Sequence, residues 1–352
     1  MKSFVYNSHP GRVIFGAGTL ITALPGEVER VGCERLLILS TPGHEALARA
    51  IAERLGGRSH VFAGARMHTP VVVTDQALAV VAQVHADGLL AVGGGSTIGL
   101  GKAIALRTDL PQIVVPTTYA GSEMTPILGQ TEDGIKATLN SPQVLPEVVI
   151  YDADLTMTLP ADLSTASGMN AIAHAVEALY ARDRNPLVSL MALEGIAALV
   201  SALPRIAVEP GDRRARADAL YGAWLCGTCL GAVGMALHHK LCHTLGGTFD
   251  LPHAATHTIV LPHALAYNAP AVPDVMTQLR TVLGEDPALA LYEFAGALGA
   301  PRALQDLGMP EQGIDEAARR ALANPYWNPR PLEFEPIQSL ITRAWAGQTP
   351  EK

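Results

Sequence analysis

The chain has 352 residues, 49% hydrophobic and 16% charged, so it is long enough for two domains with sizeable cores. Its formal net charge of −8 and the lack of a Lys/Arg run argue against a nucleic-acid partner. The N-terminus does not read as a signal peptide, and no apolar stretch of about 18 residues stands alone as a membrane span. We therefore expect a cytoplasmic protein with no membrane partner.

Short apolar runs alternate with helical patterns in the first half of the chain. Strands are predicted over residues 36–39, 61–62, 89–92 and 112–115, and helices over 44–55, 74–85 and 97–106. This alternation indicates a parallel sheet with crossover helices. The sequence predicts an α/β, Rossmann-like N-terminal domain over residues 1–159.

Nearly every periodic segment after residue 159 is helical. The predicted helices cover residues 164–181, 187–203, 213–245 (with a break left open) and 288–298. Such a run without strands indicates an all-α C-terminal domain over residues 160–352.

Cysteine usage is sparse. Cys226 and Cys229 form a CxxC, but it stands in an apolar helical stretch and no second CxxC exists. We interpret Cys33, Cys226, Cys229 and Cys242 as reduced thiols, which fits a cytoplasmic location.

A glycine loop follows the predicted strand 89–92. It reads Gly93-Gly94-Gly95-Ser96 and leads into a helix that carries Lys102. Glycines let the backbone approach a ligand, and a helix N-terminus suits a diphosphate. The loop lacks the usual GxGxxG fingerprint, and a plain tight turn is the alternative. We predict cofactor contacts from Gly93, Gly94, Gly95, Ser96 and Lys102.

Hydroxyl side chains follow two other predicted strands. Thr117 and Thr118 come after strand 112–115, and Ser40 follows strand 36–39. Ligands bind at the carboxyl edge of such sheets, so these three residues are predicted to contact the cofactor; a simple polar turn is the alternative at the threonines. The segment 40–43 holds no acidic residue to repel a 2′-phosphate and no Arg to bind one, which predicts NADH with NADPH as a usable alternative.

Seven of the twelve histidines fall between His174 and His263. Asn170 and His174 are four residues apart on a predicted helix, as are His239 and His243, and His253 follows ten residues later. A lone histidine is more often structural, which is how we interpret His238 and His257. The spacing of the others predicts a site formed by Asn170, His174, His239, His243 and His253.

Together these motifs resemble the iron-containing alcohol dehydrogenase superfamily, from Phe15-Gly16-Ala17-Gly18 to Asn328-Pro329-Arg330. The resemblance implies a dehydroquinate synthase-like fold with the active site in the cleft between the domains, and a homodimer. It also implies an Asp and three histidines as metal ligands, which map onto Asn170, His174, His239 and His253, with His243 beside the substrate.

Departures from the superfamily pattern point to one branch, the maleylacetate reductases. Asn170 replaces the ligand Asp, Gly99 replaces a second Asp, and the threonine loop is shorter and carries Tyr119. The resemblance then implies reduction of the C=C bond of maleylacetate, a small dicarboxylate, to 3-oxoadipate in aromatic degradation. Tyr119, His243 and His253 would contact the substrate.

The chemistry of this branch agrees with the loss of the ligand Asp. An amide removes one negative charge from around a cation, so no metal is expected, although three histidines can hold zinc elsewhere. Hydride addition to an enone yields a delocalised enolate, which hydrogen-bond donors can stabilise without a Lewis acid. The alternatives are a metal-dependent alcohol dehydrogenase acting on a small aldehyde or ketone, and a non-catalytic dinucleotide-binding protein.

Overall fold

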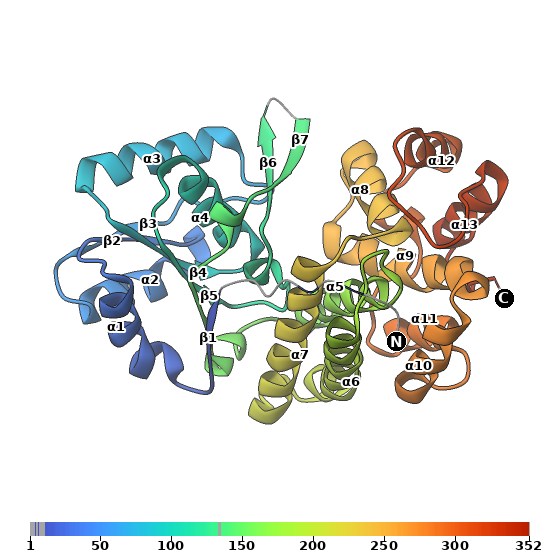
Figure 1. Cartoon of the computed structure of the whole chain (residues 1–352), viewed down its shortest axis with the longest axis horizontal. Helices are drawn as coiled ribbons and strands as arrows, with labels where there is room; N and C mark the ends of the chain where they lie inside the picture. The colour runs from blue at the N-terminus through green and yellow to red at the C-terminus, as the bar shows by residue number, and fades with distance from the viewer. Residues whose placement is uncertain (1–3, 5, 7–10, 133–134, 352) are drawn as a thin grey trace. The chain divides into compact units, whose positions relative to one another are not determined.

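The computed structural model describes residues 4, 6, 11–132 and 135–351 (Figure 1). The N-terminus, which we expect not to be a signal peptide, is only partly described, because residues 1–3 and 5 lie outside these ranges. The chain divides into two compact units, an α/β unit that ends at Leu159 and a helical unit that begins at Pro160. Phe4 and Tyr6 group with the helical unit, which corrects their assignment to the first domain. Phe4 lines a pocket there with Leu179 and Leu190.

The α/β unit is built on a parallel sheet with the order β1-β8-β5-β4-β2-β3. An antiparallel hairpin, β6 paired with β7, projects from it (Figure 1). The strands are β1 (Arg12–Phe15), β2 (Leu36–Leu39), β3 (Ser59–Phe62), β4 (Gly88–Gly93), β5 (Gln112–Pro116), β6 (Ile127–Glu132), β7 (Ile135–Asn140) and β8 (Val148–Tyr151).

Side chains alternate between the two faces of the sheet, as the two-residue period of a strand requires. Ile38 and Leu90 pack under α1 (Thr19–Val31) and α2 (Glu45–Arg54). Leu37, Leu39 and Leu89 pack on the other face, under α3 (Val71–Val84) and α4 (Gly95–Thr108). Each fully buried leucine contributes about 2 kcal/mol through the hydrophobic effect. The sheet is therefore covered by helices on both faces, as the sequence predicts.

The strand order creates a switch point beside β2. The chain runs from β2 outward to β3 and then returns to place β4 on the other side of β2. The carboxyl ends of β2, β4 and β5 consequently lie side by side, and ligands bind at such a reversal in open α/β sheets.

The helical unit begins with a long helix, α5, and contains no strand among its described residues. Its helices are α5 (Ala161–Tyr180), α6 (Pro186–Val208), α7 (Arg213–Ala232), α8 (Leu237–Phe249), α9 (His253–Asn268), α10 (Pro273–Leu283), α11 (Pro287–Ala297), α12 (Ile314–Ala323) and α13 (Phe334–Ala346). Short 3₁₀ helices cover Pro42–His44, Ser122–Met124, Pro142–Val144, Ala153–Thr156, Ala269–Ala271, Leu304–Leu307 and Glu311–Gly313.

The predicted helix 213–245 is broken. The bend between α7 and α8 is 94°. Two carboxylates, one exposed and one buried, satisfy the backbone at the break: exposed Asp183 accepts from Gly234 N at 3.0 Å, and buried Glu177 accepts from Ala236 N at 2.9 Å. Helices that leave a turn need such partners for their first N–H groups.

By length and composition alone, helix α6 is apolar enough to cross a membrane. Its mean hydropathy over 18 residues is 1.9, and 39% of that window is buried. It packs against α5 and α7, and a core helix of a protein without a membrane passes the same test of length and composition.

All four cysteines are buried and none forms a disulfide. Burial raises the pKa of the Cys226 and Cys229 thiols, which agrees with the interpretation of this CxxC as two reduced thiols.

Candidate active site

The glycine loop at the end of β4 is closely packed on one side and open on the other. A Cβ atom on Gly93 would lie 2.5 Å from Thr97 Oγ1, and one on Gly94 would lie 2.8 Å from Thr118 Cγ2. A Cβ on Gly95 would meet nothing within 4 Å, and no side chain caps the N-terminus of α4. The loop therefore presents a helix N-terminus to an open space, as a diphosphate requires.

Unpaired hydroxyl groups surround this loop. The Oγ atoms of Ser40, Thr97, Thr117 and Thr118 are buried and have no hydrogen-bond partner within the described residues. Buried hydroxyls are almost always hydrogen-bonded, so these four fit a polar ligand at the carboxyl ends of β2, β4 and β5. Of the predicted residues, the structure brings Gly93, Ser40, Thr117 and Thr118 to this edge.

Lys102 has a different place from the one predicted. Its side chain is fully buried, and Nζ lies 2.6 to 3.0 Å from the carbonyl oxygens of Ser122, Thr125 and Ile127 and from Thr125 Oγ1. Burial lowers the pKa of Lys102 to about 7, and the Glu123 carboxylate acts in the opposite direction. The ammonium group is thus occupied by the loop after β5 rather than open to a cofactor. Tyr119, predicted to contact the substrate, is also fully buried in this unit.

Gly99 shows why the second Asp is missing. A Cβ atom at this position would lie 2.4 Å from Thr69 Oγ1. His68 and Thr69 both adopt positive φ values, 62° and 46°, which bring the loop before α3 against the helix. An aspartate at position 99 is excluded by this close approach. Sequence spacing alone could not find the contact with Thr69.

The helical unit gathers the predicted histidines into one cluster. His174 lies on α5, His239 and His243 on α8, and His253 on α9. Ring centroids are 5.2 Å apart for His174 and His239, and 6.1 Å apart for His239 and His243. His257 links the rest, with centroids 5.0 Å from His239 and 4.2 Å from His253. His263, the other histidine of α9 in this stretch, lies 6.5 Å from Tyr292 instead.

Several side-chain nitrogen and oxygen atoms of this cluster have no hydrogen-bond partner among the described residues. Asn170 Oδ1, His174 Nδ1, His239 Nε2 and His257 Nε2 are buried without a partner in the part of the chain that the structure describes. Burial, followed by the neighbouring histidines, holds the pKa values of His174 and His257 well below the usual range, so both rings are neutral. The free lone pair of a neutral imidazole can accept a hydrogen bond from a ligand or bind a cation.

His238 and His257, which the sequence analysis interprets as structural, lie in the same cluster. His238 Nε2 and His257 Nδ1 are 3.0 Å apart, and Cys242 Sγ lies 3.7 Å from His238 Nε2. The three residues offer ligand atoms within 4.8 Å of one another. Together with the open atoms of Asn170, His174 and His239, these donors fit a divalent cation in type, although none of them is a carboxylate.

Glu177 is a site residue that the sequence analysis missed. Its Oε2 atom lies 2.7 Å from His239 Nδ1, and its side chain is completely buried on α5. It stands seven residues after Asn170 and three after His174, so the helical period that selected those two residues also selects Glu177. That spacing was the available signal.

Tyr326 is a second missed residue. Its hydroxyl group lies 3.1 Å from His243 Nδ1. Two residues later, Asn328 anchors the segment, because its Oδ1 accepts from Leu237 N and its Nδ2 donates to Asn268 Oδ1 at 2.7 Å. The Asn328-Pro329-Arg330 motif thereby connects this segment to the start of α8, where the histidines lie.

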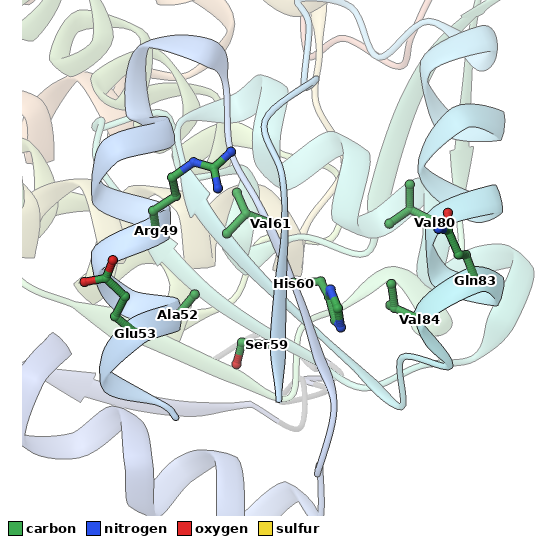
Figure 2. A pocket seen from close by; sticks show the side chains of 9 residues that line it. All are labelled: Arg49, Ala52, Glu53, Ser59, His60, Val61, Val80, Gln83 and Val84. Atoms are coloured by element: carbon green, nitrogen blue, oxygen red, sulfur yellow. The ribbon is translucent and has the colours of Figure 1, made fainter. Parts of the chain in front are cut away.

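An open pocket of about 460 Å³ lies elsewhere, at the β3 edge of the sheet (Figure 2). Arg49 and Glu53 of α2 face it from one side and Gln83 of α3 from the other, with His60 of β3 between them (Figure 2). None of the residues that line it is a predicted site residue, so this pocket is not the candidate active site.

Comparison with known proteins identifies the family. The model of the iron-containing alcohol dehydrogenases matches residues 10–153, and the model of the C-terminal region of the same family matches residues 164–345. The chain belongs to the iron-containing alcohol dehydrogenase family. It is therefore a nicotinamide-dependent oxidoreductase with this family's α/β and helical units.

Several full-length relatives within the family are identical to the chain at more than half of the aligned positions. A maleylacetate reductase from Rhizobium sp. (strain MTP-10005) is 56% identical over 100% of both chains, and one from Sphingobium indicum is 57% identical over 99% of both. The crystal structure of a maleylacetate reductase from Agrobacterium tumefaciens superposes with a TM-score of 0.97 at 54% identity, covering 99% of this chain and 100% of that one.

Proposed function

We propose that the chain reduces the C=C bond of maleylacetate to 3-oxoadipate, in the breakdown of aromatic compounds. Identities of 54% to 57% with full-length maleylacetate reductases support this substrate. The observation that carries the proposal is Asn170, an amide with an open Oδ1 in a histidine cluster where a metal-dependent member of the family would need a carboxylate.

The α/β unit is assigned to the cofactor. A bound NADH supplies the hydride for the reaction. The open N-terminus of α4 after Gly94 would bind the diphosphate, and the unpaired hydroxyls of Ser40, Thr117 and Thr118 would bind other polar groups of the dinucleotide.

The helical unit is assigned to the substrate. Hydride addition to the alkene carbon β to the ketone moves an electron pair onto the ketone oxygen as an enolate, and a proton is then taken up at the α carbon. The enolate charge is delocalised, so the Asn170 amide and nearby imidazoles can stabilise it with hydrogen bonds. His174, His239, His243 and His253 are proposed to bind the carboxylates through their N–H groups. His239, His243 and His253 are the candidates for holding the proton that is transferred, because His174 is neutral.

The cofactor is proposed to be NADH, with NADPH as a usable alternative. Ser40 follows β2, and the next residues, Thr41 to Gly43, include no acidic side chain to repel a 2′-phosphate and no Arg to bind it. Steady-state kinetics with both cofactors at saturating maleylacetate test this. A preference above roughly a thousandfold, about 4 kcal/mol, would mean that a charged discriminator lies elsewhere.

We further propose a cytoplasmic homodimer that works without a tightly bound metal and has no nucleic-acid or membrane partner. The charge of −8 argues against a nucleic-acid partner, the missing ligand carboxylate argues against a tightly bound metal, and membership of the family favours the homodimer. The alternative is a metal-dependent alcohol dehydrogenase acting on a small aldehyde or ketone. Two observations favour it: the possible ligand atoms without a partner near Asn170, and the group of His238, Cys242 and His257.

One assay separates the two functions. Purified protein is mixed with NADH and freshly prepared maleylacetate, and 3-oxoadipate is identified by mass spectrometry. Parallel reactions contain small aldehydes or ketones, with and without added zinc or ferrous iron. We expect rapid NADH oxidation with maleylacetate alone. Turnover confined to aldehydes or ketones in the presence of metal would replace the proposal with the alternative.

A further inference from the structure

The three helices that carry the histidine cluster contain a single Lys or Arg residue. Helices α5, α8 and α9 supply His174, His239, His243 and His253, and Lys240 of α8 is the one residue in them with an ammonium or guanidinium group. A neutral imidazole binds an anion only through a polar N–H group, whereas an ammonium group adds a full charge. Lys240 therefore differs from every other side chain of these helices in what it offers to an anion.

The ammonium group of Lys240 has no acidic partner. It forms no ion pair with a described residue, and the side chain is half-buried. Nζ lies instead over the aromatic ring of Tyr326, 5.7 Å from the ring centroid. Glu177, the buried carboxylate of the cluster, accepts from the backbone N–H groups of His238 and Ala236. A contact with the face of a ring leaves the N–H groups of an ammonium available to an anion.

Tyr326 brings this cation next to His243. The Tyr326 hydroxyl group lies 3.1 Å from His243 Nδ1, while its ring faces Lys240 Nζ. Lys240 and His243 are three residues apart on α8, so they share one face of the helix. Tyr326 and His243 are both exposed. An unpaired ammonium group thus lies at the accessible side of the histidine cluster.

We propose that Lys240, held over the ring of Tyr326, binds one carboxylate of the substrate. This inference rests on the proposed function, because it requires a substrate that carries a carboxylate. An ionised carboxylate only accepts hydrogen bonds, and charged donors make the strongest ones. Lys240 thereby favours a dicarboxylate over an uncharged aldehyde or ketone.

The bound carboxylate takes no part in the chemical step. Hydride and proton are added to the C=C bond, and the charge of the carboxylate is the same before and during this addition. An interaction that is equal in the ground state and the transition state acts on KM and leaves kcat nearly unchanged. Lys240 is therefore a residue for substrate binding and specificity.

The variant Lys240→Met removes the charge at nearly constant length. We expect the KM for maleylacetate to rise at least about tenfold and kcat to change less than about threefold, as for the loss of uniform binding. The KM for NADH should stay within about twofold, because the proposed cofactor residues all lie in the α/β unit. Lys240→Arg keeps the charge and should keep the KM for maleylacetate within about threefold of the wild type.

Arg319→Met is the matched control. Arg319 lies on α12 of the same unit, and its guanidinium carbon lies 4.6 Å from the centroid of the Phe334 ring. This variant therefore also removes a cation from the face of an aromatic ring. Its KM for maleylacetate should equal that of the wild type. If Lys240→Met has the same KM as the wild type, or if both variants raise KM equally, Lys240 does not bind the substrate and the inference is overturned.

Binding of adipate, a saturated dicarboxylate, tests Lys240 without turnover. Isothermal titration calorimetry of the full-length protein with saturating NAD⁺ gives the Kd for the wild type and for Lys240→Met. We expect adipate to bind at least about tenfold more weakly to the variant, with an unchanged melting temperature because no ion pair is lost. Equal affinities, or no binding to either protein, would overturn the inference. If the wild type does not reduce maleylacetate, the proposed function fails, and the adipate titration still decides whether Lys240 binds a carboxylate.

Discussion

Buried histidines of the helical unit differ in whether their ring nitrogens are paired. His263 is 3% exposed, and neither Nδ1 nor Nε2 has a partner among the described residues. Burial lowers its pKa to about 4, and Arg343 acts in the same direction. The usual pKa of 6.5 applies in the unfolded chain, so only the unfolded state takes up a proton as the pH falls from 6.5 to about 4. Stability is lost over that window.

Replacing His263 by Leu should remove this acid sensitivity. Between about pH 7.5 and pH 5, the loss in the free energy of unfolding should be smaller in His263→Leu by up to about 2 kcal/mol, since one pKa unit corresponds to about 1.4 kcal/mol. Urea denaturation at both pH values measures the difference. Parallel losses in the wild type and the variant would contradict the prediction.

The hydroxyl group of Tyr326 should matter for turnover more than for folding. It lies 3.1 Å from His243 Nδ1, and the residue is 38% exposed. A hydrogen bond of this kind contributes only about 1 kcal/mol to stability. Tyr326→Phe is therefore expected to lower kcat about tenfold and leave the melting temperature nearly unchanged. Tyr221→Phe, on α7, serves as the control, and equal kcat values for the two variants would show that Tyr326 has no role.

At the scale of elements, Lys102 connects α4 to the segment after β5. Removing its ammonium group in Lys102→Met would take a donor away from the carbonyl oxygens of Ser122, Thr125 and Ile127, of which Ser122 O still accepts from Thr125. We expect a loss of about 3 kcal/mol in the free energy of unfolding and a several-fold weaker affinity for NADH, because Thr117 and Thr118 precede the loosened loop.

Fluorescence titration with NADH and chemical denaturation measure these two effects. Arg107→Met is the matched control, because Arg107 is an exposed residue of the same helix. If Lys102→Met binds NADH as tightly as this control, the conformation of the loop after β5 does not depend on Lys102.

For the whole molecule, the open question is metal content. We predict less than about 0.1 equivalent of zinc or iron in protein purified without chelators, because Asn170 lacks the negative charge that a ligand Asp would place beside a divalent cation. A bound metal would also stabilise the folded state by mass action. Elemental analysis, activity and melting temperature before and after chelation provide the test. Stoichiometric metal that is lost together with activity would disprove the prediction.

Local patterns in the sequence were enough to predict the units and much of the site. The strand-to-helix alternation predicted the parallel sheet, and the i, i+4 spacing predicted the cluster of His174, His239 and His243, since both depend only on the period of a helix or strand. The strands β1 and β8 and the β6–β7 hairpin were missed, although β2, as short as β1 and β8, was predicted; β1 and β8 pair with each other from opposite ends of the α/β unit. Short strands of this kind are specified by their partners rather than by their own residues.

The remaining features of the site depend on contacts between segments that are far apart in the sequence. The closeness of Thr69 to Gly99, the four oxygen atoms around Lys102 and the hydrogen bond between Tyr326 and His243 each join residues far apart in the chain. No periodicity records such pairs, because they depend on how loops and helices pack in space. The sequence by itself determined which side chains this protein has for binding a dinucleotide and a dicarboxylate. Only the tertiary structure decided that Glu177 contacts His239 and that Lys102 holds a loop, because a buried polar group acts through whichever partner satisfies it.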